Sequence, residues 1–258
     1  VSAAQYDALI AAAYYQNIYK RNSPNKVAAD IQVLVPGSQL TGYSYPSSES
    51  AIAGAAVEMM KLLFPTEIAF IQQKAYEQKL SRMMVGASTR SDLEAGEALG
   101  KLVASKFVTR ARNDNAGKAI GDVAYWASLE QMCINRGETP WLSLETPKRP
   151  PMLPKFGAVK AFLVDSATIA QNRPAPPPLT TSAAFQQQVD EVKSYIDNST
   201  RERLAIVHFW ADGAGTYTPP GHWNAIAAED FVVERFSEFR WARNMALLNM
   251  TMMDAAIC

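Results

Sequence analysis

The chain has 258 residues, enough for one large domain or two small ones, and 48% of them are apolar, as expected for a globular protein with a core. Its 25 acidic and 25 basic side chains balance, so the sequence gives no electrostatic reason to expect nucleic acid or an anionic membrane surface as a partner. Two cysteines and two histidines are too few for a disulfide framework, a zinc site or multi-histidine chemistry, and no apolar run is long enough for a membrane span.

The first part of the chain has the apolar spacing of four helices, predicted at about 3–19, 49–64, 65–84 and 92–111. Short loops join these helices, so we predict an all-α fold in the form of a helical bundle.

Local signals place the ends and contacts of these helices. Pro65 is expected in the first turn of the third helix, and Ser91 with Glu94 is predicted to form a capping box for the fourth. Gly96 and Gly100 lie four residues apart on that helix, so they would permit a second helix to pack closely against it.

The stretch 113–179 has a different composition, because it holds most of the prolines and includes the polyproline-like run RPAPPP at 173–178. Trp126 and Trp141 favour an arm that packs on the bundle over a flexible linker. Helical spacing returns afterwards. It predicts helices at about 185–196, 200–210, 222–235 and 237–258, with a Gly/Pro loop at 212–221.

A Ser/Pro turn stands directly before the second helix, in the segment YSYPSSESAIAGAA at 43–56. The first N–H groups of a helix are unpaired and lie at its positive dipole end, so this junction predicts an oxyanion site. Apolar residues recur at Ile52, Ala56 and Met59, and Glu49 lies one turn upstream on the same stripe. A carboxylate that points inward here would repel a bound anion.

Several segments resemble the superfamily of type 2 phosphatidic acid phosphatases and vanadium haloperoxidases. SYPSSESAIAGAAVEMMKLLFP (44–65) is similar to its P-S-G-H or P-S-E-H motif, and SRMMVGASTRSDLEAGEALGKLVA (81–104) is similar to its S-R-x5-H-x3-D motif. KFGAVKAFLV (155–164), FWADGAGTYTPPGHWNAIA (209–227) and ALLNMTMMDAAI (246–257) resemble the haloperoxidase branch. The resemblance implies a helical bundle and a vanadate or phosphoryl group held by Lys, two Arg, Ser and a backbone N–H, with two histidines for the chemistry.

Carried over position by position, this resemblance leaves an incomplete site, because the Lys, one Arg and both His of the motifs are replaced. The seven remnants of the anion pocket are Gln16 (for the Lys), Ser23 (for an Arg), Ser47, Glu49 (for the acid–base His), Arg82, Ser88 (for the nucleophilic His) and Asp92. We therefore predict no catalytic residue, no metal site and no cofactor in this chain.

We expect Glu49 to pair with Arg82 and to stand where the oxyanion would bind. Unit charges about 4 Å apart interact by roughly 4 kcal/mol at an effective dielectric constant near 20, so the loss of two cations and the gain of a carboxylate disfavour tight oxyanion binding. A hard cation held by Glu49 and Asp92 is a lesser alternative. Asp92 is expected to start a helix, and His222 to be a packed, hydrogen-bonded residue.

The resemblance also predicts a domain order: a degenerate haloperoxidase-like bundle at 1–115, a Pro-rich wrapping arm at 116–181 and the opening helices of a second, incomplete bundle at 182–258. An intact site, with vanadate as its cofactor, would lie beyond Cys258, and a downstream segment or a second chain would complete the second bundle. The alternative is a non-catalytic interaction or structural module, which a homo-oligomer would suit. The missing initiator Met and the habit of the family favour an exported protein.

Overall fold

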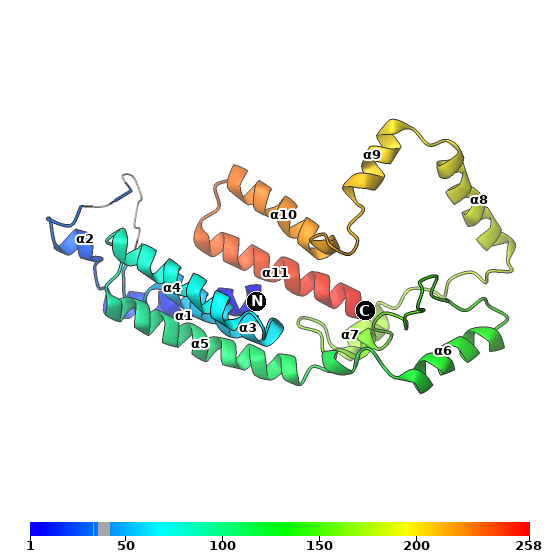
Figure 1. Ribbon diagram of the computed structural model, residues 1–258, viewed down its shortest axis with the longest axis horizontal. Coiled ribbons are helices and arrows are strands. Elements are labelled where there is room, and N and C mark those ends of the chain that lie inside the picture. The colour runs from blue at the N-terminus through cyan, green and yellow to red at the C-terminus, as the bar shows by residue number, and fades with distance from the viewer. Residues whose placement is uncertain (33, 36–41) are drawn as a thin grey trace. The chain divides into compact units, whose positions relative to one another are not determined.

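The computed structural model describes residues 1–32, 34–35 and 42–258, and all regular secondary structure in them is helical (Figure 1). This confirms the predicted all-α fold class. The chain divides into two compact units: unit 1 is 1–113 with 227–251, and unit 2 is 114–226 with 252–258. The predicted division into a bundle, a Pro-rich arm and the start of a second bundle, with boundaries at 115 and 181, stays a prediction. In the part of the chain that the structure describes, no helix is both long and apolar enough to cross a membrane.

In its described residues, unit 1 contains five complete helices, and the final part of α10 and most of α11 also belong to it. The bounds are α1 Ser2–Tyr19, α2 Pro24–Val27, α3 Ser48–Leu63, α4 Ile68–Met84, α5 Arg90–Arg112, α10 Thr218–Val233 and α11 Glu238–Ile257.

The core of unit 1 lies where α1, α3 and α5 meet, and it consists largely of alanine. Larger side chains of α5 pack around its edge. The buried cluster is Ala4, Ala8, Ala12, Ala51, Ala55, Met59 and Ala104. Because these side chains are short, the three helix axes can approach closely.

Two glycines make the contact between α3 and α5 still closer. A Cβ atom on Gly96 would overlap the carbonyl oxygen of Ser47, and one on Gly100 would overlap that of Ala51. The predicted close packing at these glycines is therefore confirmed. It places the N-terminus of α3 directly against the first turns of α5.

This close approach also changes which face of α3 is buried. The sequence predicted an inward stripe through Ile52 and Ala56, but Ala51 and Ala55 are buried, and Ile52 and Ala56 are only half-buried. Ala51 faces the core in place of its larger neighbour Ile52 because only a small side chain fits there. α4 also starts later than predicted, at Ile68, and has no buried residue.

Unit 2 is built from shorter helices and irregular segments. Its bounds are η1 Ala116–Lys118, α6 Val123–Asn135, η2 Phe156–Ala158, α7 Ser166–Gln171, α8 Ala183–Asp197 and α9 Arg201–Phe209, with the start of α10 and the end of α11. Its small core is Ala119, Val159 and Ile257, with Phe156, Ala161, Ile169 and Met253 packed against it.

Two elements of unit 2 differ from the sequence prediction. α6 lies inside the predicted Pro-rich arm, in a stretch without proline, and the Asp122 side chain caps it by accepting a 2.9 Å hydrogen bond from Tyr125 N. α10 begins at Thr218 and not at His222, because Pro219 and Pro220 occupy its first turn, where proline fits without loss of a hydrogen bond.

A buried carboxylate fastens the irregular segment after η2 to the end of α11. Asp254 is buried, and it accepts hydrogen bonds from Phe162 N (2.7 Å) and Leu163 N (2.6 Å). Bonds of this kind to an ionised acceptor are among the stronger ones in proteins.

We predict that Gly100→Ala destabilises the protein by about 1–3 kcal/mol, because the added methyl group must displace the α3 backbone. Helix propensity alone would give the opposite sign, since alanine favours a helix by about 1 kcal/mol over glycine. Urea denaturation measures the change. Gly117→Ala is the control, because a Cβ there meets nothing within 4 Å. An unchanged or raised midpoint for Gly100→Ala would contradict the packing described here.

We predict that Asp254→Ala lowers the free energy of unfolding by about 1–3 kcal/mol, since two backbone N–H groups lose their charged acceptor. Asp254→Asn keeps one acceptor oxygen and should cost less. Equilibrium denaturation of the two variants measures this order, and equal losses would show that the hydrogen bonds are not the cause.

Candidate functional site

A polar cavity of about 280 Å³ lies in unit 1 and brings together six of the seven predicted site residues. Side chains from α1, α3, α4 and α11 line it, with residues from the segments between these helices. The six are Gln16, Ser23, Ser47, Glu49, Arg82 and Ser88. The seventh, Asp92, does not line it.

The N-terminus of α3 forms one wall, and a carboxylate already occupies it. Ser47 is the N-cap, and its hydroxyl accepts a hydrogen bond from Ser50 N. The Ser47 hydroxyl also lies 3.1 Å from Glu49 Oε2 and that of Ser48 lies 3.3 Å from it, so both can donate to the carboxylate. Glu49 stands in the first turn of α3, where the helix dipole favours negative charge.

Arg82, near the end of α4, lies opposite this carboxylate. The distance from its Nη1 to Glu49 Oε1 is 3.5 Å, so the predicted ion pair is present. The two side chains are 30% and 32% exposed, so the pair is only partly buried. Solvent weakens a pair at this exposure, and its net contribution to stability is about 0–1 kcal/mol.

Asp92 does not line the cavity, but it is hydrogen-bonded to Ser47, which does. It is fully buried at the third position of α5, where it accepts a 2.7 Å hydrogen bond from Thr89 N and lies 3.2 Å from the guanidinium of Arg21. Its backbone oxygen accepts a 2.9 Å bond from Ser47 N. Asp92 therefore starts a helix, as predicted, and it also positions the N-cap of α3.

The capping box of α5 is Thr89 with Asp92, and the predicted pair of Ser91 with Glu94 is wrong. Both pairs match the same sequence pattern. The structure selects the earlier pair because the Asp92 carboxylate can be buried between Thr89 N and Arg21, whereas Glu94 is exposed.

Three of the remnants differ in how far their side chains are engaged. Gln16 donates from Nε2 to the carbonyl of Pro46 at 2.8 Å, and Ser23 donates to Asn25 Oδ1 at 2.6 Å. Ser88 is only 6% exposed, and its hydroxyl has no hydrogen-bond partner among the described residues. The Ser88 hydroxyl is therefore a group of the cavity lining that a ligand could bind.

Sequence reasoning missed the second carboxylate of the cavity, Glu238, which comes from the first turn of α11. Surrounding protein atoms raise the pKa of Glu238 by desolvation, although the residue as a whole is exposed. The charge of Glu49 raises this pKa further, and Arg82 lowers it. No local signal marks Glu238, because it meets α3 and α4 only in the tertiary fold.

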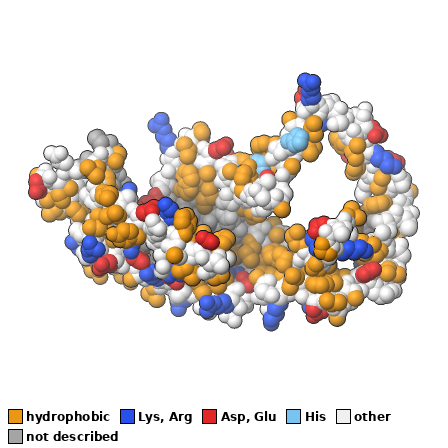
Figure 2. All heavy atoms as spheres, viewed as in Figure 1, with side chains coloured by type: hydrophobic (Ala, Val, Ile, Leu, Met, Phe, Trp, Pro, Cys, Tyr) orange, Lys and Arg blue, Asp and Glu red, His pale blue; other side chains and the backbone are white. Residues whose placement is uncertain are grey.

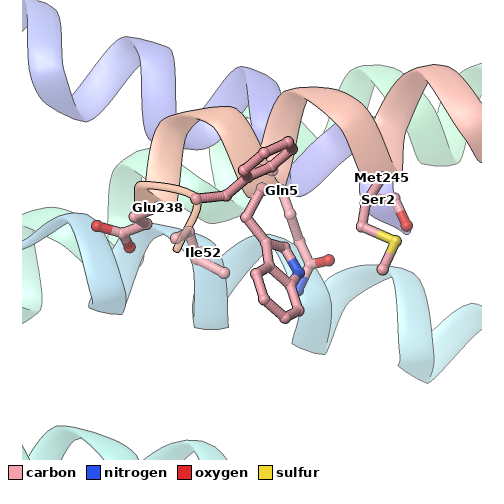
Figure 3. Close-up of a pocket in the computed structure, with 8 residues that line it drawn as sticks. Ser2, Gln5, Ile52, Glu238 and Met245 are labelled. Carbon is pink, nitrogen blue, oxygen red and sulfur yellow. The ribbon is translucent and has the colours of Figure 1, made fainter. Parts of the chain in front are cut away.

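A second cavity, of about 390 Å³, lies between α1, α3 and α11 (Figure 3). Ile52, Phe236, Trp241 and Met245 make it largely apolar. Figure 3 shows Glu238 at one end of this cavity and Met245 at the other. Glu238 also lines the polar cavity, so this residue borders both spaces.

The histidine of the segment 209–227, His222, is buried in unit 2. His222 is 3% exposed, and its Nδ1 lies 2.8 Å from Asp212 Oδ2. Its ring packs against Phe209, Trp210 and Tyr217, with centroids 4.6–5.2 Å apart. The expectation of a packed, hydrogen-bonded histidine is confirmed.

The described lining of the cavity differs from the site of the superfamily that the motifs resemble. Its described lining contains one cation, Arg82, and two carboxylates, and it contains no histidine or lysine. Across the described residues, no three His, Cys, Asp or Glu side chains come together as a metal site. On the face drawn in Figure 2, acidic and basic side chains are interspersed, in keeping with the zero net charge.

Comparisons of the chain with family models, with curated proteins and with solved structures give no match. Membership of the haloperoxidase superfamily therefore stays a prediction from the motifs. The chemistry of the polar cavity is the observation on which a function can be proposed.

We predict that replacing Glu238 by Gln stabilises the protein more at pH 7 than at pH 3. A carboxyl whose pKa is raised by folding contributes stability below its unfolded pKa, and that contribution is lost as the pH rises through the folded pKa. Because the residue is partly exposed, the change should stay below about 1 kcal/mol. Thermal unfolding across this range measures the difference between variant and wild type. Glu229→Gln, an exposed change on α10, is the control for the loss of one charge. A stability difference that shrinks with rising pH would contradict this account of Glu238.

Proposed function

We propose that unit 1 is a non-catalytic helical module of a vanadium-haloperoxidase-like or acid-phosphatase-like protein, in which the anion pocket has become a pocket that excludes oxyanions. The observation that carries the proposal is the Glu49–Arg82 pair inside a cavity lined by the motif residues.

The electrostatics of the cavity support this proposal. An oxyanion site works by placing several donors and cations where negative charge collects. Here the only cation of the described lining is engaged by Glu49, and Glu238 adds a second carboxylate. A phosphate or vanadate ion would enter a space with a net negative charge when both carboxylates are ionised.

The described lining residues also include no histidine or lysine that could act as the base for a serine nucleophile. Ser88 stands where the family has its nucleophile, but no imidazole or amine lines the cavity to activate it. Both histidines of the chain belong to unit 2, and His222 is hydrogen-bonded to Asp212. In this proposal, vanadate and the chemical step belong to a site outside this chain, in a segment after Cys258 or in a second chain.

A second candidate function is docking to another protein, and α8 is the observation that favours it. Phe185 and Val189 on this helix are half-buried, whereas Val192 and Ile196 on the same stripe are 59% and 68% exposed. An apolar helix face of this kind suits a helical partner. Light scattering of the wild type and of a Val192→Ser, Ile196→Ser variant tests it. A monomer in both cases would count against a self-association surface.

We predict that the wild-type chain does not bind vanadate at millimolar concentration, and that the double variant Glu49→Gln, Glu238→Gln binds it at least about tenfold more tightly. The double variant removes both carboxylates and frees Arg82, and a tenfold change corresponds to about 1.4 kcal/mol. Calorimetric titration measures binding, and Glu229→Gln controls for net charge. Micromolar vanadate affinity, halide oxidation or phosphatase activity in the wild type would refute the proposed function.

A further inference from the structure

We propose that the polar cavity binds a primary ammonium group that carries an apolar chain, with the ammonium near Glu238 and Ser88 and the chain in the neighbouring apolar cavity. This inference rests on the proposed function, because it assigns a ligand to a pocket that oxyanions cannot occupy.

The two carboxylates of the polar cavity differ in whether their charge is paired. Glu49 is engaged by Arg82 and by the hydroxyls of Ser47 and Ser48. Glu238 lines the same cavity and has no ion pair within 4 Å among the described residues. The cavity thus offers one carboxylate whose charge is not directly compensated.

Ser88 provides a hydroxyl without a hydrogen-bond partner among the described residues. Ser88 lines the cavity and is 6% exposed as a residue. A ligand that donates to this oxygen would therefore break no hydrogen bond within the described part of the protein. A primary ammonium has three N–H donors and no acceptor, which suits a carboxylate and a hydroxyl oxygen together.

A largely apolar cavity lies beside Glu238. The cavity in Figure 3 begins at this side chain and continues past Ile52 toward Met245, with Trp241 also in its lining. At about 390 Å³ it has room for a short alkyl chain, and burying each CH₂ group is favourable. An ammonium with an apolar tail therefore matches both spaces, whereas a metal ion or a bare ammonium matches only the polar one.

The pKa of Glu238 agrees with this assignment. Desolvation and Glu49 raise it, and the opposing effect of Arg82 does not cancel them. A ligand cation would favour the ionised carboxylate and so reverse this shift.

The test is calorimetric titration of the full chain at neutral pH with n-hexylammonium, 1-hexanol and hexanoate, with methylammonium as the probe without a chain. We expect hexylammonium to bind at least tenfold more tightly than each of the other three. Glu238→Gln should weaken its binding at least tenfold and Ser88→Ala about threefold or more, while Glu229→Gln should leave it unchanged. Thermal melts show whether each variant is folded. If Glu238→Gln does not fold, Ser88→Ala still tests the proposed site.

The possible results distinguish a failure of the ammonium site from a failure of oxyanion exclusion. Equal binding of hexanol, or no effect of either cavity variant, would overturn the ammonium site. If neither amine nor anion binds, this inference is wrong but oxyanion exclusion stands. If hexanoate and vanadate bind, both are wrong. A parallel titration with Nα-acetyl-lysine amide distinguishes a free amine from a lysine side chain of a partner protein, because tighter binding of the lysine derivative indicates the latter.

Discussion

The ion pair between Glu49 and Arg82 determines what the polar cavity of this protein can hold. A helix N-terminus with a Ser/Pro turn in front of it attracts negative charge, and in this chain the helix supplies that charge itself. Glu49 accepts from two serine hydroxyls and faces the one arginine of the described cavity. The favourable interactions that a bound oxyanion would make are therefore already made by a covalently attached carboxylate. Because the pair is partly exposed, its importance lies in occupying the site more than in stabilising the fold.

The scaffold behind this pair is more tightly built than the cavity itself. Alanine and glycine bring α1, α3 and α5 into close contact. Asp92 is buried behind the cavity, where its backbone oxygen holds Ser47 N. These residues fix the direction of the α3 N-terminus without touching the cavity. A fold and its site can change independently for this reason, and the site must be judged by its own chemistry.

Unit 2 is stabilised by individual polar contacts more than by a large core. Asp254 holds two backbone N–H groups of an irregular segment, and Asp212 holds His222 inside a cluster of aromatic rings. The long proline-containing segments cannot form a continuous hydrogen-bond ladder of their own, so side-chain acceptors take over part of that role. The segment 209–227, which resembles the haloperoxidase branch, contributes in this way, since His222 is buried and hydrogen-bonded to Asp212.

The sequence by itself determined the helical class, most helix positions and six of the residues that line the polar cavity. Helix periodicity is local, and each motif residue lies near a helix end, so placing the helices also places these residues. The tertiary structure decided what depends on contacts between distant segments. It buried Ala51 in place of Ile52, because α5 approaches too closely for a larger side chain, and it chose Thr89 over Ser91 as the cap, because the Asp92 carboxylate fits between Thr89 N and Arg21. It also brought Glu238 from α11 to the cavity of Glu49, which no spacing along the chain could show, since the two residues meet only after the helices pack.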